Sequence, residues 1–320
     1  MNIPFALTLP RQEDGDGGLP RHRSLVTAMD TVVSIEAASA APEQEVLAAL
    51  ERAGRWFGTV ERVCSRFDPA SELRQLVAHV GEPMLASPVL FEAVQFAIAL
   101  ARRTGGAFDP TVGQQLEAMG FNRNYVTGET SHSEPPAGGR VSYRDVRLDP
   151  ARRTVTLRRP LVLDLGAVAK GLAVDLAARE LAPYERFCID AGGDLYVRGR
   201  NRAGQPWRIG VQDPRDPAAV VCAIEASDEA VCTSGDYERR TADGLAHHLL
   251  DPRTGRAAAA LRSVTVVAPT AMAADGLATA AFVLGADRGL RLLTKEGTEG
   301  FCITTTGEMR MTPGFERRIL

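Results

Sequence analysis

A carboxylate and an ammonium group flank a run of small residues between positions 162 and 171. The run reads Val-Leu-Asp-Leu-Gly-Ala-Val-Ala-Lys-Gly, so that Asp164 precedes Gly166 and Lys170 follows it. We expect a short apolar strand that stops at Gly166 and turns into a helix running to about Leu181. Free N–H groups at such a helix start attract anions, and Lys170 in the first turn would add a mobile cation. The segment suits a phosphorylated ligand with a polar ring, and an ordinary strand–helix turn with a solvated lysine is the structural alternative.

A second candidate pair, Asp275 and Thr279, lies four residues apart and so shares one face of a predicted helix. A carboxylate and a hydroxyl that point the same way can hold Mg²⁺, which prefers oxygen ligands and needs few from the protein when phosphates supply the rest. The alternative is a threonine bonded to its own helix and an aspartate near the helix N-terminus. Asp275 stands in an alanine-rich apolar helix, however, where an unpaired buried carboxylate is costly.

Two glycine-rich or proline-rich loops carry aromatic side chains. In residues 104–113, a turn would present Phe108 to pack on a flat heterocycle and Asp109 to accept from its N–H groups. A helix C-cap followed by a proline turn explains the same segment equally well. Residues 64–69 form another ordered loop with one aromatic, Phe67.

The adjacent histidines His247 and His248 stand before a turn that contains Asp251. Neighbouring side chains on a strand point to opposite faces, so metal ligation by this pair is not expected. Residues 189–194 and 232–237 are small-residue turns with acidic ends, and each alone is compatible with a hairpin bulge or an Asx turn. Taken singly these patterns are weak, and their order along the chain carries more information.

Composition is that of an ordinary globular protein. The 320 residues are 45% hydrophobic and 24% charged, with a formal net charge of −3, so no nucleic-acid partner and no membrane span are expected. The five cysteines form no Cys-x-x-Cys pair, which argues against a zinc knuckle or a disulfide framework. No basic flank, cleavage site or lipid-acceptor cysteine marks the N-terminus, so we expect a cytoplasmic protein, or a periplasmic one if a leader has been removed.

The elements that must position these groups do not alternate strictly between helix and strand. Helices are expected over 42–64, 87–105, 166–181, 270–285 and 286–296, and strands over 26–37 with an interruption at 29–31, 141–148, 154–157, 186–190, 194–199, 207–212, 220–226, 230–232, 261–268, 300–305 and 308–312. Ser87 and Thr270 are predicted helix N-caps. This mixture predicts the α+β class, with mixed, largely antiparallel sheets flanked by helices, and not a doubly wound parallel sheet.

One domain is expected after a short tail. Residues 1–24 are predicted to form a loose N-terminal tail, because glycine, aspartate and arginine dominate their second half. Residues 25–320 are predicted to form a single domain of two interlocked α/β subdomains. Within that domain, residues 122–140 contain many prolines and glycines and few apolar side chains, which predicts a long loop.

Taken in order, the motifs resemble those of the ApbE family of FAD:protein FMN transferases. The resemblance covers about residues 25–312 and runs from Ala28-Met29-Asp30-Thr31 to Asp275-x-x-x-Thr279. Its most specific segments are 105–111, 164–171, 233–237 and 248–255. The family implies an ApbE-like fold and an enzyme that binds FAD and Mg²⁺ and cleaves the flavin pyrophosphate. Such an enzyme attaches FMN through a phosphoester to a Thr or Ser of a target flavoprotein and releases AMP.

The resemblance also implies roles for individual residues. FAD contacts are expected from Met29, Phe67, Ala107, Phe108, Asp109, Asp164, Lys170, Leu249 and Leu250. Metal ligands are expected from the Ala167 carbonyl, Asp275 and Thr279. Family members often have tyrosine in place of Phe67, so a hydroxyl hydrogen bond is lost here while stacking survives. Some members carry a second aspartate where this chain has Ala278, which leaves fewer charged ligands for a metal without nucleotide.

The expected reaction needs positioning and charge neutralisation more than covalent chemistry from the protein. Mg²⁺, Lys170 and the helix N-terminus would neutralise the pyrophosphate. The acceptor hydroxyl needs a general base, for which Asp275, Asp251 and His248 are the candidates. Because an acceptor must reach the phosphates, we expect a cleft open to solvent with an adjoining peptide groove.

Two other functions would use the same site. Water as the acceptor would make the protein a Mg²⁺-dependent FAD pyrophosphatase that yields FMN and AMP. A carrier would hold FAD without turnover, which Ala278 favours slightly and the retained Asp275, Thr279 and Lys170 disfavour. A Rossmann dehydrogenase is a weak fourth alternative, because no Gly-x-Gly-x-x-Gly motif follows a strand.

Overall fold

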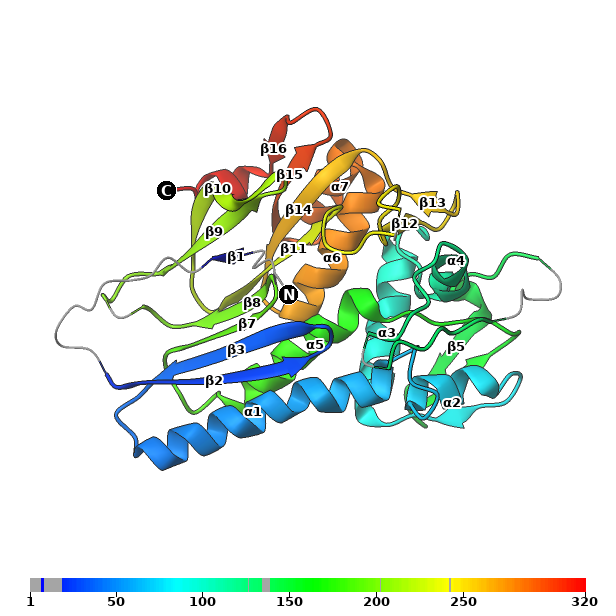
Figure 1. Ribbon diagram of the computed structural model, residues 1–320, viewed down its shortest axis with the longest axis horizontal. Helices are drawn as coiled ribbons and strands as arrows, with labels where there is room; N and C mark the ends of the chain where they lie inside the picture. Colours follow the sequence, from blue (N-terminus) through cyan, green and yellow to red (C-terminus); the bar gives the residue numbers. More distant parts are fainter. Residues whose placement is uncertain (1–6, 9–18, 126, 134–138, 202, 242) are drawn as a thin grey trace.

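An eight-stranded antiparallel sheet forms the centre of the molecule (Figure 1). The computed structural model describes residues 7–8, 19–125, 127–133, 139–201, 203–241 and 243–320. The strand order is β16-β15-β14-β11-β8-β7-β3-β2, and each neighbouring pair is antiparallel. The strands are β2 (Arg21–Ala28), β3 (Thr31–Ala38), β7 (Phe187–Ala191), β8 (Asp194–Arg198), β11 (Glu229–Gly235), β14 (Leu261–Ala268), β15 (Glu299–Thr304) and β16 (Met309–Met311).

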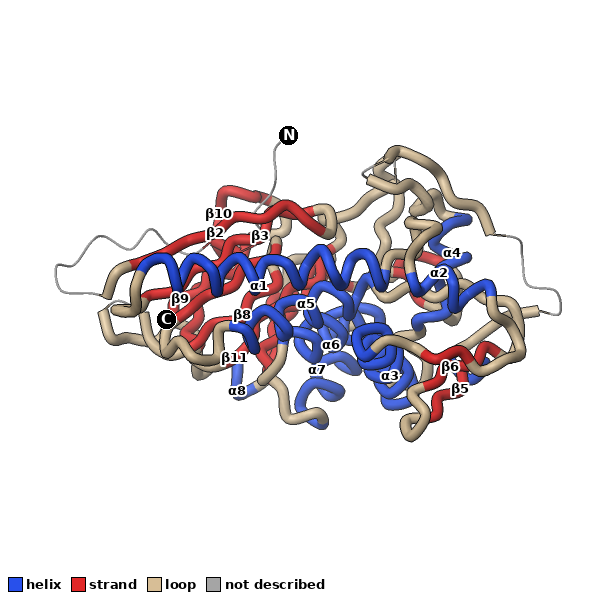
Figure 2. The backbone as a smooth tube through the Cα atoms, turned by 90° about the horizontal axis from the view of Figure 1, so that it is seen from below, coloured by secondary structure: helices blue, strands red, loops and turns tan. Residues whose placement is uncertain are grey.

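Helices cover one face of this sheet, as Figures 1 and 2 show. They are α1 (Glu43–Cys64), α5 (Gly166–Glu180), α6 (Ala271–Leu284) and α7 (Ala286–Lys295). Helix α1 is amphipathic, because Val46, Leu50 and Phe57 recur at helical spacing and are fully buried. Helix α6 contacts α3, α5, α7 and three strands, so most of its side chains are apolar and buried. This sandwiched position explains its alanine-rich sequence.

A smaller sheet packs on the opposite face. Its order is β1-β9-β10, from β1 (Leu7–Thr8), β9 (Trp207–Asp213) and β10 (Asp216–Ala226). A second apolar core fills the space between the two sheets, and the short helix α8 (Pro313–Glu316) contributes to it. There Phe315 stacks on Phe301 with ring centroids 5.5 Å apart.

The remaining elements form a smaller part beside the helical layer, on the right of Figure 1. They are α2 (Glu72–Ala78), α3 (Pro88–Arg103), α4 (Gly113–Ala118), the 3-10 turns Pro110–Val112 and Tyr143–Asp145, the three-stranded sheet β4 (Met84–Leu85), β6 (Thr154–Leu157) and β5 (Val146–Asp149), and the hairpin β12 (Leu250–Asp251) and β13 (Arg256–Ala257). Helix α3 contacts α1, α5 and α6, which joins this part to the main sheet through one continuous core.

The predicted α+β class with largely antiparallel sheets and flanking helices is confirmed. Both predicted N-caps are present, because Ser87 Oγ accepts from the Leu90 N–H at 3.2 Å and Thr270 Oγ1 accepts from the Ala273 N–H at 3.3 Å. None of the helices in the described part of the chain is long and apolar enough to cross a bilayer.

Two strand predictions are wrong. The expected single strand over 26–37 is a hairpin, because Met29 and Asp30 adopt φ values of 54° and 63° and reverse the chain between β2 and β3. The expected strand before Gly166 is absent. Residues 160–165 pair with no strand, and two backbone hydrogen bonds join them to Pro110 in the 3-10 turn and to Gly113 at the start of α4.

The ends of the predicted tail and loop differ in detail from the structure. Strand β2 begins at Arg21, inside the predicted tail, and Leu7–Thr8 pairs with β9. The described residues of the predicted loop 122–140 form no helix or strand, and one isolated bridge joins Arg123 to Thr130. Residues 126 and 134–138 of that loop lie outside the described part.

Candidate active site

One cavity of about 500 Å³ gathers every residue expected to contact FAD or the metal. Its wall contains Met29, Phe67, Ala107, Phe108, Asp109, Asp164, Ala167, Lys170, His248, Leu249, Leu250, Asp275 and Thr279. These side chains come from the β2–β3 hairpin, the loops after α1 and α3, the start of α5, the segment before β12 and helix α6. The fold thus brings together positions that span most of the chain.

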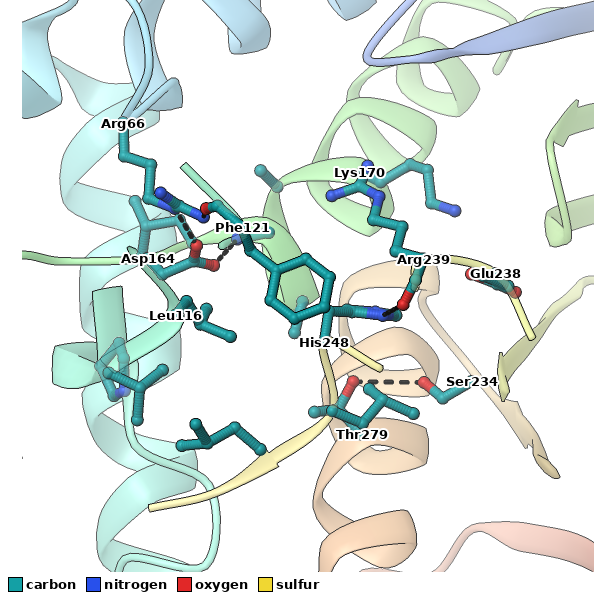
Figure 3. A pocket seen from close by; sticks show the side chains of 18 of the residues that line it. Arg66, Leu116, Phe121, Asp164, Lys170, Ser234, Glu238, Arg239, His248 and Thr279 are labelled. Carbon is teal, nitrogen blue, oxygen red and sulfur yellow. Dashed lines mark hydrogen bonds and ion pairs between the residues drawn. The ribbon is translucent and has the colours of Figure 1, made fainter. Parts of the chain in front are cut away.

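The carboxylate before α5 is bound by the protein itself. Asp164 Oδ1 accepts from the Gly166 N–H at 2.8 Å. Its Oδ2 accepts from Arg66 Nε, a bond that Figure 3 shows. Desolvation works against the carboxylate charge, but the Arg66 guanidinium outweighs it and holds the pKa of Asp164 below its ordinary value. Asp164 therefore fixes the start of α5 instead of ending a strand.

Lys170 is not the mobile cation of a first helical turn. It lies in the second turn of α5, and its Nζ forms an ion pair with Asp194 at 2.9 Å. Burial opposes the ammonium charge, but Asp194, Glu238 and Asp275 together raise the pKa of Lys170 above its ordinary value. Lys170 is thus a fixed charge within an acidic cluster.

Three carboxylates surround that lysine, and only part of their charge is neutralised. Burial, then the charge of Asp194, raises the pKa of Asp275 well above its ordinary value. Burial raises the pKa of Glu238 to about 7, and its Oε1 has no hydrogen-bond partner among the described residues. Such a cluster offers carboxylate oxygens to a further cation.

Hydroxyl oxygens lie close to the Asp275 carboxylate, which is on α6. Thr279 Oγ1 lies 3.2 Å from Ser234 Oγ, and Asp275 Oδ2 accepts weakly from the Gly171 N–H at 3.4 Å (Figure 3 shows the Thr279–Ser234 pair). Ala167 lines the same cavity one turn before Gly171. This donor set fits a hard divalent cation. No group of three His, Cys, Asp or Glu side chains at metal-binding distances occurs in the described part of the chain.

Ala278 takes no part in this cluster. It is fully buried in the main apolar core and does not line the cavity.

Two features of the cavity wall, the Phe67 ring and the turn at Met29, are fixed by the protein itself. The Arg66 guanidinium lies over the Phe67 ring, 4.0 Å from its centroid, so one face of that ring is already covered. Met29 and Asp30 both line the cavity in left-handed backbone conformations that side chains other than glycine, asparagine and aspartate rarely adopt. The turn that presents Met29 is therefore strained.

Asp109 holds its own loop. Its Oδ1 accepts from the Thr111 N–H at 3.0 Å and from the Thr111 hydroxyl at 2.8 Å, and Oδ2 accepts from the Tyr143 N–H at 3.0 Å. Burial raises the pKa of Asp109 in spite of these bonds. The carboxylate thus keeps Ala107 and Phe108 at the cavity wall.

The three candidate bases differ in their surroundings. Asp251 forms a bidentate ion pair with Arg253 at 2.9 Å and lines a neighbouring cavity, not this one. His248 lies in the wall of the main cavity, and its Nδ1 is 3.4 Å from the Arg239 carbonyl, which can only accept (Figure 3). Desolvation, then the charge of Arg239, lowers the pKa of His248 to about 3. A neutral imidazole with its proton on Nδ1 leaves the Nε2 lone pair free to accept a proton.

Sequence reasoning missed several residues of the cavity wall: Arg66, Asp194, Ser234, Glu238 and Arg239. Two of them stood in turns noted for their acidic ends, but nothing in the sequence indicated their partners. The Arg66–Asp164 pair joins residues 98 positions apart, and only the folded chain brings them together.

Comparison with known proteins gives one consistent result. A family model described as the ApbE family matches residues 29–302. The FAD:protein FMN transferase of Treponema pallidum is 33% identical over 333 residues, which cover 95% of this chain and 91% of that protein. The FAD:protein FMN transferase of Vibrio cholerae is 35% identical over 234 residues, which cover 71% of this chain and 70% of that protein.

Solved structures agree with the sequence matches. The ApbE protein of Thermotoga maritima superposes with a TM-score of 0.82 at 31% identity, covering 93% of this chain and 99% of that one. The flavin transferase ApbE of Vibrio cholerae superposes with a TM-score of 0.79 at 28% identity, again over 93% and 99% of the two chains.

Proposed function

Since this chain belongs to the ApbE family, we propose that it is a Mg²⁺-dependent FAD:protein FMN transferase. It cleaves FAD, attaches FMN through a phosphoester to a Thr or Ser of a target flavoprotein, and releases AMP. One observation carries this proposal: a single cavity combines an apolar wall, a helix start, an acidic and hydroxyl cluster and a neutral histidine. A flavin, a pyrophosphate, a divalent cation and an acceptor hydroxyl need these four features.

Two parts of the cavity bind the flavin nucleotide: an apolar surface for the ring system and the start of α5 for the pyrophosphate. Met29, Phe67 and Phe108 offer apolar and aromatic surface for the ring system, with the loop Ala107–Asp109 and the segment Leu249–Leu250 closing around it. The pyrophosphate lies by the start of α5, where Asp164 fixes the backbone and small residues allow close approach.

Ala167 O, Asp275 and Thr279 would hold Mg²⁺, which when bound neutralises the charge that develops on the phosphate oxygens. Lys170 is held in place by its ion pair with Asp194, and the charge of Asp275 acts on the same ammonium. The same ammonium faces the cavity and adds positive charge beside the phosphates.

His248 is the proposed general base for the acceptor. Its Nε2 takes the proton from the acceptor hydroxyl while that oxygen forms a bond to the phosphorus nearest the flavin. The bond from this phosphorus to the bridging oxygen breaks, and the oxygen leaves as part of AMP. The low pKa of His248 keeps the imidazole unprotonated at neutral pH, as a base requires.

The test is AMP release from FAD with Mg²⁺, measured with and without a flavoprotein that bears a flavinylation Thr or Ser. In-gel flavin fluorescence after denaturation reports covalent transfer. A fluorescent acceptor band with a matching amount of AMP is the expected result. AMP without a labelled band would indicate a pyrophosphatase, and FAD binding with neither product would indicate a carrier.

A further inference from the structure

The basic side chains of the cavity are nearly all committed to the protein. Four of the five that line it bond to protein acceptors, namely Arg66, Arg123, Lys170 and Arg240. Arg239 is the fifth. Within the described part of the chain, its guanidinium makes neither a hydrogen bond nor an ion pair. Its N–H donors are therefore free.

Arg239 is exposed and lines the cavity, so its free charge is open both to the cavity and to solvent. Its carbonyl accepts from His248 Nδ1, which fixes the backbone of the residue against the cavity wall. In Figure 3 its side chain extends from that point toward the first turns of α5. The charge of Arg239 also acts on His248 and on Asp164, on two sides of the cavity.

The start of α5 favours the same kind of ligand. Leu165 at the N-cap provides no side-chain hydrogen bond, and Gly166 and Ala167 present backbone without bulky side chains. A helix N-terminus of this kind attracts negative charge, but it supplies only partial charge. A guanidinium supplies a full charge and a fork of N–H groups that matches two phosphate oxygens at once.

We propose that Arg239 binds the phosphates of FAD through its guanidinium, opposite the start of α5. This inference rests on the proposed function and adds a residue to it. FAD brings a pyrophosphate into a cavity whose Lys170 is already paired with Asp194, so that lysine alone leaves much of the ligand charge unbalanced. Arg239 supplies the missing positive charge, and it contacts the substrate directly.

The experiment compares the affinities of FAD and riboflavin, measured by flavin fluorescence in titrations with the full-length protein. Riboflavin shares the ring system but has no phosphate. Arg239→Gln should weaken FAD binding by about ten- to a hundredfold. It should leave riboflavin binding unchanged. Arg239→Lys keeps the charge without the fork, and its FAD affinity should fall between those of the other two proteins.

Arg208→Gln is the matched control. Arg208 is exposed on β9 outside the cavity, so the same loss of one charge there should alter neither affinity. Equal FAD affinity in wild type and Arg239→Gln would overturn the inference while leaving the proposed function intact. Parallel losses of FAD and riboflavin binding would also overturn it, because the role of Arg239 would then be structural. A wild-type protein that bound riboflavin and not FAD would sink the proposed function itself and this inference with it.

Discussion

At the scale of single residues, the charged groups of the cavity first hold one another in place. Asp164 is bonded to Arg66 and to the start of α5, Asp109 holds its own loop, and Lys170 is paired with Asp194. Preorganised charges of this kind lose little freedom when a ligand binds. The cavity is therefore built before the substrate arrives, and its single-residue variants should separate binding from turnover.

Asp275→Asn is the variant that should separate FAD binding from turnover most clearly. The amide keeps the shape of the buried side chain and removes one charge from the proposed metal site, so AMP release should fall by about a hundredfold or more while FAD still binds. Because burial raises the pKa of Asp275, the neutral variant should unfold at an equal or higher temperature than wild type. Assays of AMP release, FAD titration and thermal unfolding test each part.

Asp251→Asn is the control for that variant. Its carboxylate pairs with Arg253 outside the cavity, so AMP release should stay at the wild-type rate. Loss of activity in Asp251→Asn, with full activity in Asp275→Asn, would reverse the assignment.

Met29→Gly tests whether the strained turn places the Met29 side chain against the flavin. Glycine adopts a φ of 54° without strain, so the free energy of unfolding should change by no more than about 1 kcal/mol. The flavin loses a side-chain contact, and FAD affinity should fall by roughly tenfold. Asp228→Gly also places glycine at a left-handed position, with a φ of 56°, but away from the cavity, and it should bind FAD as wild type does. Equal affinities in both variants would remove Met29 from the flavin site.

At the scale of elements, the crossing of α5 and α6 sets the distance between the two halves of the phosphate site. Gly171 faces α6 so closely that an added Cβ would lie 2.5 Å from the Ala271 carbonyl oxygen and 2.6 Å from the Met272 Cα. Backbone atoms at such distances cannot move aside individually. The helices can approach only because residue 171 has no side chain.

Gly171→Ala should therefore push α6, with Asp275 and Thr279, away from α5. The expected cost is about 1–3 kcal/mol in the free energy of unfolding, with a higher Mg²⁺ concentration required for half-maximal AMP release. Gly58→Ala is the control, because a Cβ there would meet nothing within 4 Å and alanine favours the α1 helix. Unchanged Mg²⁺ dependence in Gly171→Ala would show that the crossing does not set the metal site.

A buried carboxylate at the same crossing predicts a pH dependence of stability. Asp175 on α5 accepts from the first N–H groups of α6, Ala271 at 2.7 Å and Met272 at 3.0 Å. Burial raises the pKa of Asp175 to about 6 from 3.8. A raised folded-state pKa contributes stability that is fully present below the unfolded value and is lost as the pH rises through about 6.

The measurement is the difference in unfolding free energy between wild type and Asp175→Asn across this range. Between pH 7.5 and pH 5.0 wild type should gain about 1.4 kcal/mol over the variant, from the shift of about two pKa units. A difference that stays constant with pH would mean that Asp175 titrates normally in the folded protein.

Most elements could be predicted from the sequence, because local signals determine them. The Ser87 and Thr270 caps and the apolar spacing of α1 depend on neighbouring residues only. The β2–β3 hairpin could not be recognised, because its turn uses Met29 and Asp30 where such turns normally use asparagine and glycine. The apolar run before α5 resembled a strand, yet it is bonded to a 3-10 turn and to the start of α4, and periodicity alone does not show whether such a run pairs with a strand.

The residues of the site likewise fall into those that could be predicted from the sequence and those that could not. Candidate site positions such as Asp275 and Thr279 could be predicted from motif order, and all those expected to contact FAD or the metal line one cavity. Their protein partners could not, because Lys170 meets Asp194, and Arg66 meets Asp164, only through the tertiary fold. Motifs therefore indicated which residues line the cavity and not how the protein balances their charge.

At the scale of the whole molecule, the cavity joins the two structural parts. Its wall includes Met29 beside the main sheet, Leu116 and Phe121 in and after α4, and Thr279 on α6. The main apolar core runs through both parts, from β3 and α1 to α3 and β6. The two parts are therefore expected to unfold together, and a ligand in the cavity should stabilise both.

Thermal unfolding with FAD and Mg²⁺ tests this expectation. At a free FAD concentration of about one hundred times its Kd, binding should add about 2.7 kcal/mol to the free energy of unfolding, and one transition should move to higher temperature. Mg²⁺ alone should have little effect, because its only charged ligand would be Asp275 and the remaining donors are neutral oxygens. Two transitions, of which FAD shifts only one, would show that the parts unfold independently. A full shift with Mg²⁺ alone would show a metal site that is complete before the nucleotide binds.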